Sequence, residues 1–262
     1  MSSNLAVERA LILLRYIVDN PDGLSIREAS RVLGYNPATV QKLINSLSSQ
    51  SYVVQDELTD RYHLGPGAVQ LGLAALARLD VRQVARPHLE ALQTECGETT
   101  FLAIPRGDHV VYIDKVVSTE PIRMDAPLGI DRPFNCTAVG KVLLAGLPNE
   151  EMTRLAAEGM FEQRTERSIC EVDALRAEIE QVRLQGWARD DEEYSPGVGC
   201  IAAPVRDHEG QIVAALTVSG PAERIDEKLD CILAQITTHS TAISEEMGFR
   251  SPQPAINGRV QP

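Results

Sequence analysis

Residues 25–61, SIREASRVLGYNPATVQKLINSLSSQSYVVQDELTDR, decide the fold of the N-terminal part of this chain. Ser25 and Glu28 form a capping box, in which each side chain satisfies a backbone N–H group at the start of a helix. A glycine ends that helix, and Asn36 and Pro37 open a second one as its N-cap and first helical residue. Two helices joined by a tight turn and followed by a β-ribbon are the outline of a winged helix-turn-helix.

The two faces of the second helix differ in chemistry. Apolar residues at i, i+3, i+4 and i+7 form its inner face, which consists of Val40, Leu43, Ile44 and Leu47. The outer face carries small, amide and basic side chains, namely Ala38, Thr39, Gln41, Lys42 and Asn45. Such a face suits a major groove, because Gln can bond adenine twice, Lys can reach phosphate or guanine, and Thr and Ala can touch a thymine methyl. The alternative is a plain helical hairpin with a solvated outer face.

The hairpin that follows favours the DNA-binding interpretation. Residues 52–54 and 61–64 flank a polar tip, and Arg61 stands where a wing can meet phosphate or a minor groove. Arg27 adds a cation to the predicted contacts. Residues 25–50 carry three basic side chains and one acidic, but residues 1–64 carry six basic and seven acidic. The prediction therefore depends on the motif, and we expect modest affinity per copy, made up by dimerisation on several half-sites.

The composition limits the class of protein. With 262 residues, 44% of them hydrophobic, the chain can form one large or two modest domains. A net charge of −12 argues against a protein that coats nucleic acid non-specifically. The chain lacks an apolar run of about 18 residues and a secretory leader, so we expect a cytoplasmic protein without a membrane partner. Five widely spaced cysteines without a CxxC pair predict reduced thiols and no metal; no cofactor is expected.

Two further helices are expected around the reader domain. Residues 5–20 are predicted to close its three-helix core through an apolar stripe at Val7, Leu11, Leu14 and Val18. Residues 68–79 are helical in pattern and apolar nearly all round, and such a helix must be buried. We interpret it as a linker helix that packs against its twin in a homodimer. The alternative is that it lies on the second domain.

The remaining chain alternates helices and hairpins. Helices are expected at 84–96, 136–146, 149–158, 172–185 and 225–247, and strands at 99–104, 110–117, 121–124, 187–193, 201–206 and 211–219. This order indicates an α+β sensor in which helices surround an antiparallel sheet that cups a small molecule. The predicted organisation is a DNA-binding domain at 1–64, a linker helix at 65–80, a sensor at 81–249 and a disordered tail at 250–262.

Three places in the sensor could carry chemistry. Residues 135–141 open a helix whose N–H groups and positive dipole end suit an anion. Thr217 and Ser219 share one face of an apolar strand, where cross-strand hydrogen bonding is the alternative to a ligand contact. Residues 190–193, DDEE, fit a solvated strand end with one inward acid. No nucleophile motif, P-loop or dinucleotide fingerprint is present, so catalysis is not expected.

These segments together resemble the isocitrate lyase regulator (IclR) family of bacterial transcription factors over roughly residues 5–249. The resemblance is carried by VERA at 7–10, GLS at 23–25, RYHLG at 61–65, CTAVGK at 136–141, DDEEY at 190–194, GVGCIAAPV at 197–205 and SGP at 219–221. It implies a winged helix-turn-helix, a linker helix and a GAF-like sensor for a small aliphatic or aromatic carboxylate. It also implies dimers, often paired into tetramers, that repress or activate catabolic operons from operator DNA, with repression as our expectation.

The resemblance also implies an effector pocket formed by Arg132, Ala138, Val139, Asp190, Cys200, Thr217 and Ser219. In this mapping two backbone N–H groups, on Ala138 and Val139, would bind an effector carboxylate. The two hydroxyls would donate hydrogen bonds, the thiol would line the wall, and the aspartate would accept from a hydroxyl or amide of the effector.

Two positions depart from the family pattern. Val139 stands where some members have glycine or alanine, which implies a tighter cup. Asn135 replaces a histidine often found before the cysteine, which alters polarity at the mouth of the cup. The sequence leaves two other classes open: a sensor enzyme that uses Asp190 and its neighbours on a small acid, and a scaffold whose N-terminal domain binds protein.

Overall fold

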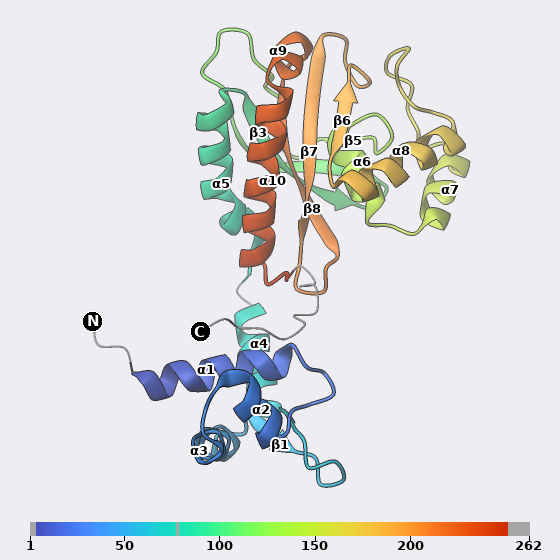
Figure 1. Ribbon diagram of the computed structural model, residues 1–262. Helices are drawn as coiled ribbons and strands as arrows, with labels where there is room; N and C mark the ends of the chain where they lie inside the picture. The colour runs from blue at the N-terminus through green and yellow to red at the C-terminus, as the bar shows by residue number, and fades with distance from the viewer. Residues whose placement is uncertain (1–3, 77–78, 251–262) are drawn as a thin grey trace. The chain divides into compact units, whose positions relative to one another are not determined.

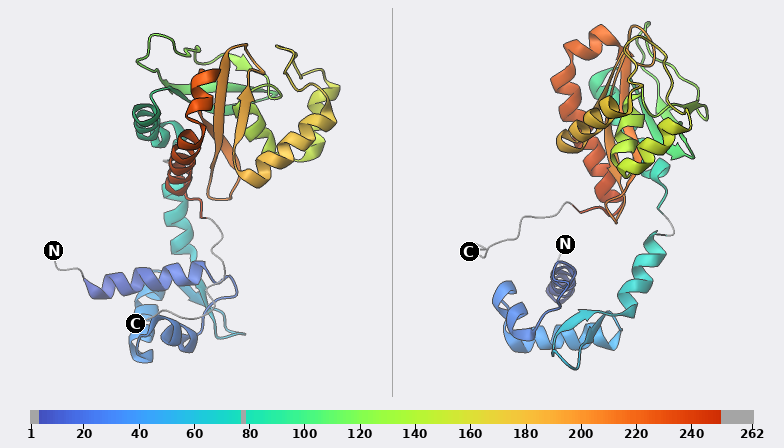
Figure 2. Two further views of the ribbon diagram at one scale, coloured as in Figure 1. Left: turned by 45° about the horizontal axis from the view of Figure 1, so that its top comes forward. Right: turned by 90° about the vertical axis from the view of Figure 1, so that its right-hand side faces the viewer.

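The computed structural model describes residues 4–76 and 79–250, and the chain divides into two compact units at 1–79 and 80–262. Figures 1 and 2 show both units, and each is described by itself here. The linker helix belongs to the first unit. The tail predicted to be disordered lies outside the described residues, except for Arg250.

The first unit is a winged helix-turn-helix. Its elements are α1 (Leu5–Val18), α2 (Ile26–Leu33), α3 (Pro37–Ser49), β1 (Val53–Gln55), β2 (Tyr62–Leu64) and α4 (Pro66–Leu76). The capping box is confirmed, because Ser25 and Glu28 each accept the other's backbone N–H, at 3.3 and 3.0 Å. Asn36 caps α3 as predicted, and three of the four predicted inner residues of α3 are buried. The fourth, Leu47, is half-buried against the same core.

The predicted apolar stripe of α1 is wrong at three of its four residues, and the fourth, Leu14, is half-buried against the core. Leu13 and Ile17 are the buried residues of this helix, whereas Val7, Leu11 and Val18 are 54%, 61% and 47% exposed. The helix packs against α3 and β2 through the face next to the predicted stripe, because both faces are apolar and tertiary contacts chose between them. Its second apolar face is left uncovered within the unit.

The linker helix α4 is also uncovered. It begins at Pro66, two residues before the predicted start, and spans Pro66–Leu76, whereas residues 77 and 78 of the predicted helix lie outside the described residues. Val69, Leu71 and Leu73 are 58%, 61% and 61% exposed. These side chains stay exposed within residues 4–76, although an apolar helix normally buries such side chains against a partner.

The second unit contains one antiparallel sheet of order β5-β4-β3-β8-β7-β6. Its strands are β3 (Thr99–Arg106), β4 (His109–Val116), β5 (Asp131–Arg132), β6 (Ala188–Asp191), β7 (Val198–Arg206) and β8 (Ile212–Pro221). Its helices are α5 (Val81–Cys96), α6 (Ala138–Ala145), α7 (Asn149–Ala157), α8 (Val172–Gln185), α9 (Ala222–Glu227) and α10 (Leu229–Glu246). Helices α5 and α10 lie side by side on one face of the sheet, and α6 with α8 packs on the other (Figure 1). The α+β class is confirmed.

Two predicted elements of the second unit are wrong. Residues 121–124 form an irregular segment instead of a strand, and the carbonyl of Met124 accepts a hydrogen bond from the Thr99 hydroxyl at 2.6 Å. The long helix predicted at 225–247 is divided into α9 and α10 at Lys228, whose φ of −107° leaves the helical range. Lys228 is held there because its Nζ donates to the carboxylate of the buried Glu98 at 3.2 Å.

Candidate DNA-binding surface and effector pocket

The outer face of α3 is open to solvent. Ala38, Lys42 and Asn45 are exposed, and Thr39 and Gln41 are half-buried. Gln41 Nε2 donates to Asn45 Oδ1 at 2.9 Å, which aligns the two amides along the helix. The five side chains predicted for this helix therefore lie on one broad face that the unit itself does not bury.

The guanidinium of Arg61 is bonded within its own domain and is not a free cation. Its guanidinium donates to two loop carbonyls, on Asp22 and Gly23, at 2.9 and 3.0 Å, and to the Glu28 carboxylate at 2.9 Å. A backbone hydrogen bond from Ser25 is the main cause that lowers the pKa of Glu28, and Arg61 contributes to it. Arg61 thus ties the wing to the start of α2, and its contact with DNA stays a prediction. Arg27 is exposed on α2.

The tip of the wing is acidic, with Asp56, Glu57 and Asp60 around Leu58, which is 96% exposed. The Asp56 carboxylate accepts the backbone N–H groups of Leu58 and Thr59 at 2.8 and 3.1 Å. These bonds, chiefly the one from Leu58, lower the pKa of Asp56. A tip with ionised carboxylates repels phosphate, which leaves Arg27 of α2 and Lys42 of α3 as the predicted cationic contacts.

In the second unit, the N-terminus of α6 has free backbone N–H groups that an anion can approach closely. The Thr137 hydroxyl caps the helix by accepting the N–H of Gly140 at 3.1 Å. A Cβ on Gly140 would lie 2.2 Å from the Phe134 carbonyl oxygen, so only glycine fits there. The N–H groups of Ala138 and Val139 have no acceptor among residues 4–76 and 79–250, and they are available to an anion.

Arg132 lies between two aromatic rings. Its Cζ is 5.0 Å from the ring centroid of Tyr112 and 4.9 Å from that of Tyr194, and Arg164 stacks on Tyr194 at 5.2 Å. Arg132 is only 6% exposed, and its Nε–H has no partner in the described part of the chain. The cation–π contacts hold the charge in place and leave a donor for a ligand.

Three strands bring the predicted sheet residues into one row. Asp190 on β6 pairs with Cys200 on β7, which pairs with Ser219 on β8, and all three are buried. Ser219 Oγ has no hydrogen-bond partner apart from the weak thiol of Cys200 beside it. The Thr217 hydroxyl instead donates to the Ile201 carbonyl of the neighbouring strand at 2.8 Å. The cross-strand alternative therefore holds for Thr217 and not for Ser219.

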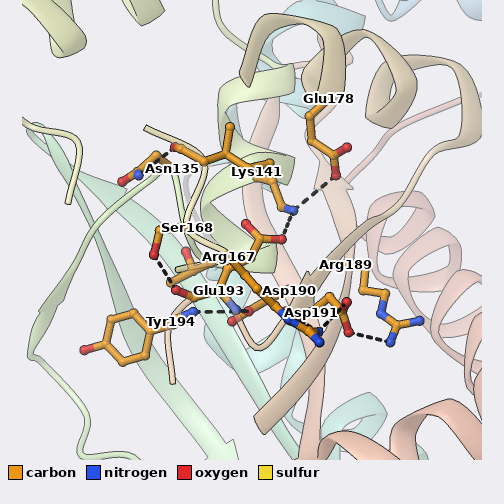
Figure 3. Close-up of polar contacts among 12 residues, drawn as sticks. Asn135, Lys141, Arg167, Ser168, Glu178, Arg189, Asp190, Asp191, Glu193 and Tyr194 are labelled. Atoms are coloured by element: carbon orange, nitrogen blue, oxygen red, sulfur yellow. Dashed lines mark hydrogen bonds and ion pairs between the residues drawn. The ribbon is translucent and has the colours of Figure 1, made fainter. Parts of the chain in front are cut away.

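Two of the four consecutive acids face inward, which corrects the prediction of one inward acid at 190–193. Asp190 is 2% exposed and Glu193 is 6% exposed. Glu193 pairs with the buried Lys141, whose Nζ lies 2.6 Å from Glu193 Oε1 and 3.1 Å from Glu178 Oε1 (Figure 3). The ion pair of Lys141 was not predicted, although a lysine inside a helix of apolar and small residues is a signal for a buried ion pair.

Burial determines the titration of both inward acids. It raises the pKa of Asp190 to about 7, even though backbone N–H groups of Glu193 and Tyr194 bond Asp190 Oδ1 at 2.7 and 3.3 Å. Burial also raises the pKa of Glu193, against the attraction of Lys141. Near neutral pH the Asp190 carboxyl is therefore partly protonated, so it can either accept or donate a hydrogen bond.

Three buried polar atoms around Cys200 are poorly satisfied in the described residues: Arg132 Nε and Glu193 Oε2 have no hydrogen-bond partner, and Ser219 Oγ has only the weak thiol of Cys200. Each such atom costs about 1–3 kcal/mol when it is left unpaired. Buried polar groups of this kind are normally satisfied by a ligand or by ordered water. Their concentration beside the start of α6 marks this region as the candidate effector pocket.

Asn135 does not lie at the mouth of the pocket, which corrects the sequence-based expectation. It is fully buried, its Nδ2 donates to the carbonyls of Glu162 and Ile169 at 3.0 and 2.9 Å, and its Oδ1 accepts the N–H of Glu162 at 3.0 Å. Asn135 thus fastens the segment between α7 and α8 to the residues before α6.

The second unit also contains a surface hollow. This hollow is lined by residues that include Val142, Val182, Pro204 and Ile212 and shares no residue with the predicted pocket. Within residues 4–76 and 79–250, no three His, Cys, Asp or Glu side chains are arranged to hold a metal ion. Over the same residues, no helix has the length and apolar character needed to cross a bilayer.

An open polar helix on a winged helix-turn-helix and a buried polar cluster in a separate α+β unit define a ligand-responsive DNA-binding regulator. The chain belongs to the IclR family of bacterial transcriptional regulators. The family model described as "Bacterial transcriptional regulator IclR C-terminal" matches residues 73–245, and "IclR helix-turn-helix domain" matches residues 6–57. The sequence-based identification of the family is confirmed.

Similar proteins agree with this assignment. The HTH-type transcriptional regulator XynR of Escherichia coli is 32% identical over 245 residues, which cover 93% of this chain and 97% of that protein. The HTH-type transcriptional repressor AllR of Salmonella typhimurium is 31% identical, with 94% and 91% covered. The crystal structure of the Agobacterium tumefaciens repressor BlcR superposes with a TM-score of 0.82 at 26% identity, with 95% and 100% covered. The chain is therefore a transcriptional regulator and not an enzyme, as predicted.

Proposed function

We propose that this chain represses a catabolic operon and that a small organic acid, aliphatic or aromatic, bound in the second unit controls it. The observation that carries the proposal is the set of unpartnered polar atoms around Cys200, beside the unbonded N–H groups of Ala138 and Val139. Such a set fits a carboxylate with a neighbouring polar group. A repressor that acts on genomic DNA in a bacterium works in the cytoplasm.

Control of DNA binding then follows from two conformations. If the effector binds one arrangement of the sensor better, it shifts the population toward that arrangement and changes the spacing of two DNA-binding units. Effector and operator must alter each other's affinity by the same factor. A screen of small carboxylic acids by thermal shift, followed by gel-shift titration with each hit, tests both statements, because a ligand of the folded state raises the melting temperature.

DNA contacts are assigned to the outer face of α3 and to Arg27. We expect Gln41→Ala to weaken specific operator binding about 5- to 100-fold by removing a bidentate base contact. Lys42→Ala should weaken binding to all sequences and lower the salt dependence by about one ion. Gel-shift titrations at two salt concentrations measure both effects.

Gln50→Ala is the matched control, because Gln50 is an exposed glutamine at the C-terminal end of the same helix. It should bind operator normally. Unchanged operator affinity in the Gln41 and Lys42 variants, with all proteins folded, would refute the assigned roles.

In the effector pocket, Arg132 and the first N–H groups of α6 would bind the carboxylate, and Ser219 would donate its hydroxyl. Asp190 would contact a second polar group of the effector, and Cys200 and Val139 would bound the apolar part. Thr217 lines the same sheet face, but its hydroxyl already bonds Ile201, so we assign it a smaller role.

The variant Ser219→Ala is expected to weaken the effector response, and its combination with Thr217→Val is expected to abolish it, while DNA binding survives. Loss of one hydroxyl donor should lower effector affinity about 10-fold. Thr217→Val alone should mainly lower stability, because it removes the bond to Ile201. The shift in melting temperature with effector and the effector-dependent release of operator are the measurements. Ser240→Ala, a buried serine of α10, is the control, and a normal response in the Ser219 variant would exclude this pocket.

A homodimer completes the proposal, with pairing of dimers into tetramers as an extension of it. The exposed apolar residues of α4, together with the uncovered face of α1, form a surface that a second copy of the chain would bury. Exposed apolar surfaces of this kind in a regulator mark an interface, and two copies would present two recognition helices to an operator with two half-sites.

A further inference from the structure

A chain of four side chains joins α5 to α10, away from both candidate sites. His88 Nδ1 and His239 Nδ1 lie 3.1 Å apart, and the two rings meet edge to face with centroids 5.4 Å apart. His88 Nε2 lies 3.2 Å from Glu246 Oε1, and His239 Nε2 lies 3.2 Å from Glu95 Oε2. The two imidazole side chains are only 18% and 12% exposed.

These contacts determine how many protons the four ring nitrogens of His88 and His239 carry. A carboxylate only accepts hydrogen bonds, so both Nε2 atoms must carry a proton to bond Glu246 and Glu95. The contact between the two Nδ1 atoms needs one proton, since two bare nitrogens or two N–H groups at 3.1 Å would repel each other. Four ring nitrogens therefore share three protons, which makes one ring neutral and the other an imidazolium.

We propose that His88 and His239 form a proton-sharing pair that fastens α5 to α10 and makes this contact sensitive to pH near neutrality. The pair carries one positive charge between two carboxylates, which the charge-assisted bonds at both ends favour. Loss of the shared proton leaves two facing lone pairs, and a second proton places two N–H groups against each other. The pair is therefore best satisfied at a single, intermediate state of protonation.

Several other charged groups on the neighbouring elements have partners of their own, and Asp230 and Glu245 of α10 are exposed to solvent. On α5, Arg86 bonds Glu90 and also Asp114 of β4, at 2.8 and 3.0 Å. Arg206 of β7 donates to the carbonyl of Gly210. The residues of β3 and β8 that face α5 and α10 are Thr100, Leu102, Leu216 and Val218, and none of them is charged. The carboxylates that contact the pair are those of Glu95 and Glu246.

The protonation of the pair affects the contact between α5 and α10 and therefore the stability of the second unit. Helix α5 is the first helix of the second unit, so the chain enters that unit through it. A free imidazole titrates near pH 6.5. The contact is complete only when the pair shares one proton, so its contribution to stability is largest in that state of protonation. That contribution is lost as the shared proton leaves at higher pH, and also as a second proton enters at lower pH.

Thermal unfolding between pH 5 and pH 9 tests the proposal on the full chain. Wild type should show a maximum in melting temperature near neutrality, and His88→Gln or His239→Gln should lower this maximum by about 3–6 °C and flatten it. His208→Gln is the matched control, because His208 is a half-exposed histidine of the same unit whose nearest carboxylate is 3.9 Å away. It should follow the wild-type curve.

Nitrogen NMR of the imidazole rings in the wild type keeps the test independent of how the variants fold. At pH 7 both Nε2 atoms should be protonated and the two Nδ1 atoms should share one proton. Two unprotonated Nδ1 atoms at pH 7 would overturn the proposal, as would identical pH curves for wild type and His239→Gln. A melting temperature that zinc raises and a chelator lowers, in wild type alone, would show a metal between the rings and also overturn it.

Discussion

Replacing Lys141 by methionine is expected to destabilise the second unit by about 3–5 kcal/mol, the cost of leaving a buried charge without its partner. The Lys141 side chain is 1% exposed and that of Glu193 is 8% exposed, and the second oxygen of Glu193 already has no partner in the described residues. Urea unfolding followed by the fluorescence of Trp187, the single tryptophan of the chain, reports on this unit alone.

The loss should be larger at pH 8 than at pH 5. Burial raises the pKa of Glu193, so the variant can protonate this carboxyl at low pH, whereas at high pH it must bury the negative charge. Combining Lys141→Met with Glu193→Gln removes both charges and should recover much of the stability. Arg176→Met, which breaks a surface pair with Asp173, should cost less than about 1 kcal/mol. Equal stability of Lys141→Met and wild type would show that the pair is not a buried ion pair in solution.

Substitutions on α4 are expected to have the second large effect, a loss of dimerisation and of operator affinity. Val69→Glu combined with Leu73→Glu places two charges one turn apart on a surface that we propose to be a dimer interface. The double variant should be monomeric and should bind operator about 100-fold more weakly or worse, because each half-site would then be bound independently. Light scattering gives the mass, and gel-shift titration gives the affinity.

Leu184→Glu is the matched control for this experiment. Leu184 lies on α8 of the second unit and is 81% exposed, so a charge there tests the effect of an added glutamate without touching α4. It should leave both mass and DNA affinity unchanged. A dimer with full affinity in the α4 variant would place the contact between copies elsewhere.

Local signals in the sequence predicted most elements of the fold. The capping box at Ser25 and Glu28 and the Asn36–Pro37 helix start fixed α2 and α3 because caps act over three or four residues. The faces of α1 could not be predicted in the same way. This helix has two adjacent apolar faces, and only the packing of α3 and β2 decides that Leu13 and Ile17 are buried.

The candidate pocket was predicted in part. The family resemblance supplied Asp190, Cys200 and Ser219, and strand pairing does bring these three residues into one row. It did not supply Lys141, because the contact of that side chain with Glu193 joins residues 52 positions apart, and no local pattern reports such a pairing. Nor could the sequence divide the roles of Thr217 and Ser219, since the register with Ile201 decides which hydroxyl is already bonded.

The acidic tip of the wing has a consequence for the search for an operator. Each phosphate that a protein neutralises releases condensed counterions, and this release drives attachment to any sequence. A wing with ionised carboxylates at its tip and with Arg61 bound internally contributes little to that release. Few copies of such a regulator would be sequestered on the rest of the chromosome, so a small number of molecules per cell could keep one operator occupied.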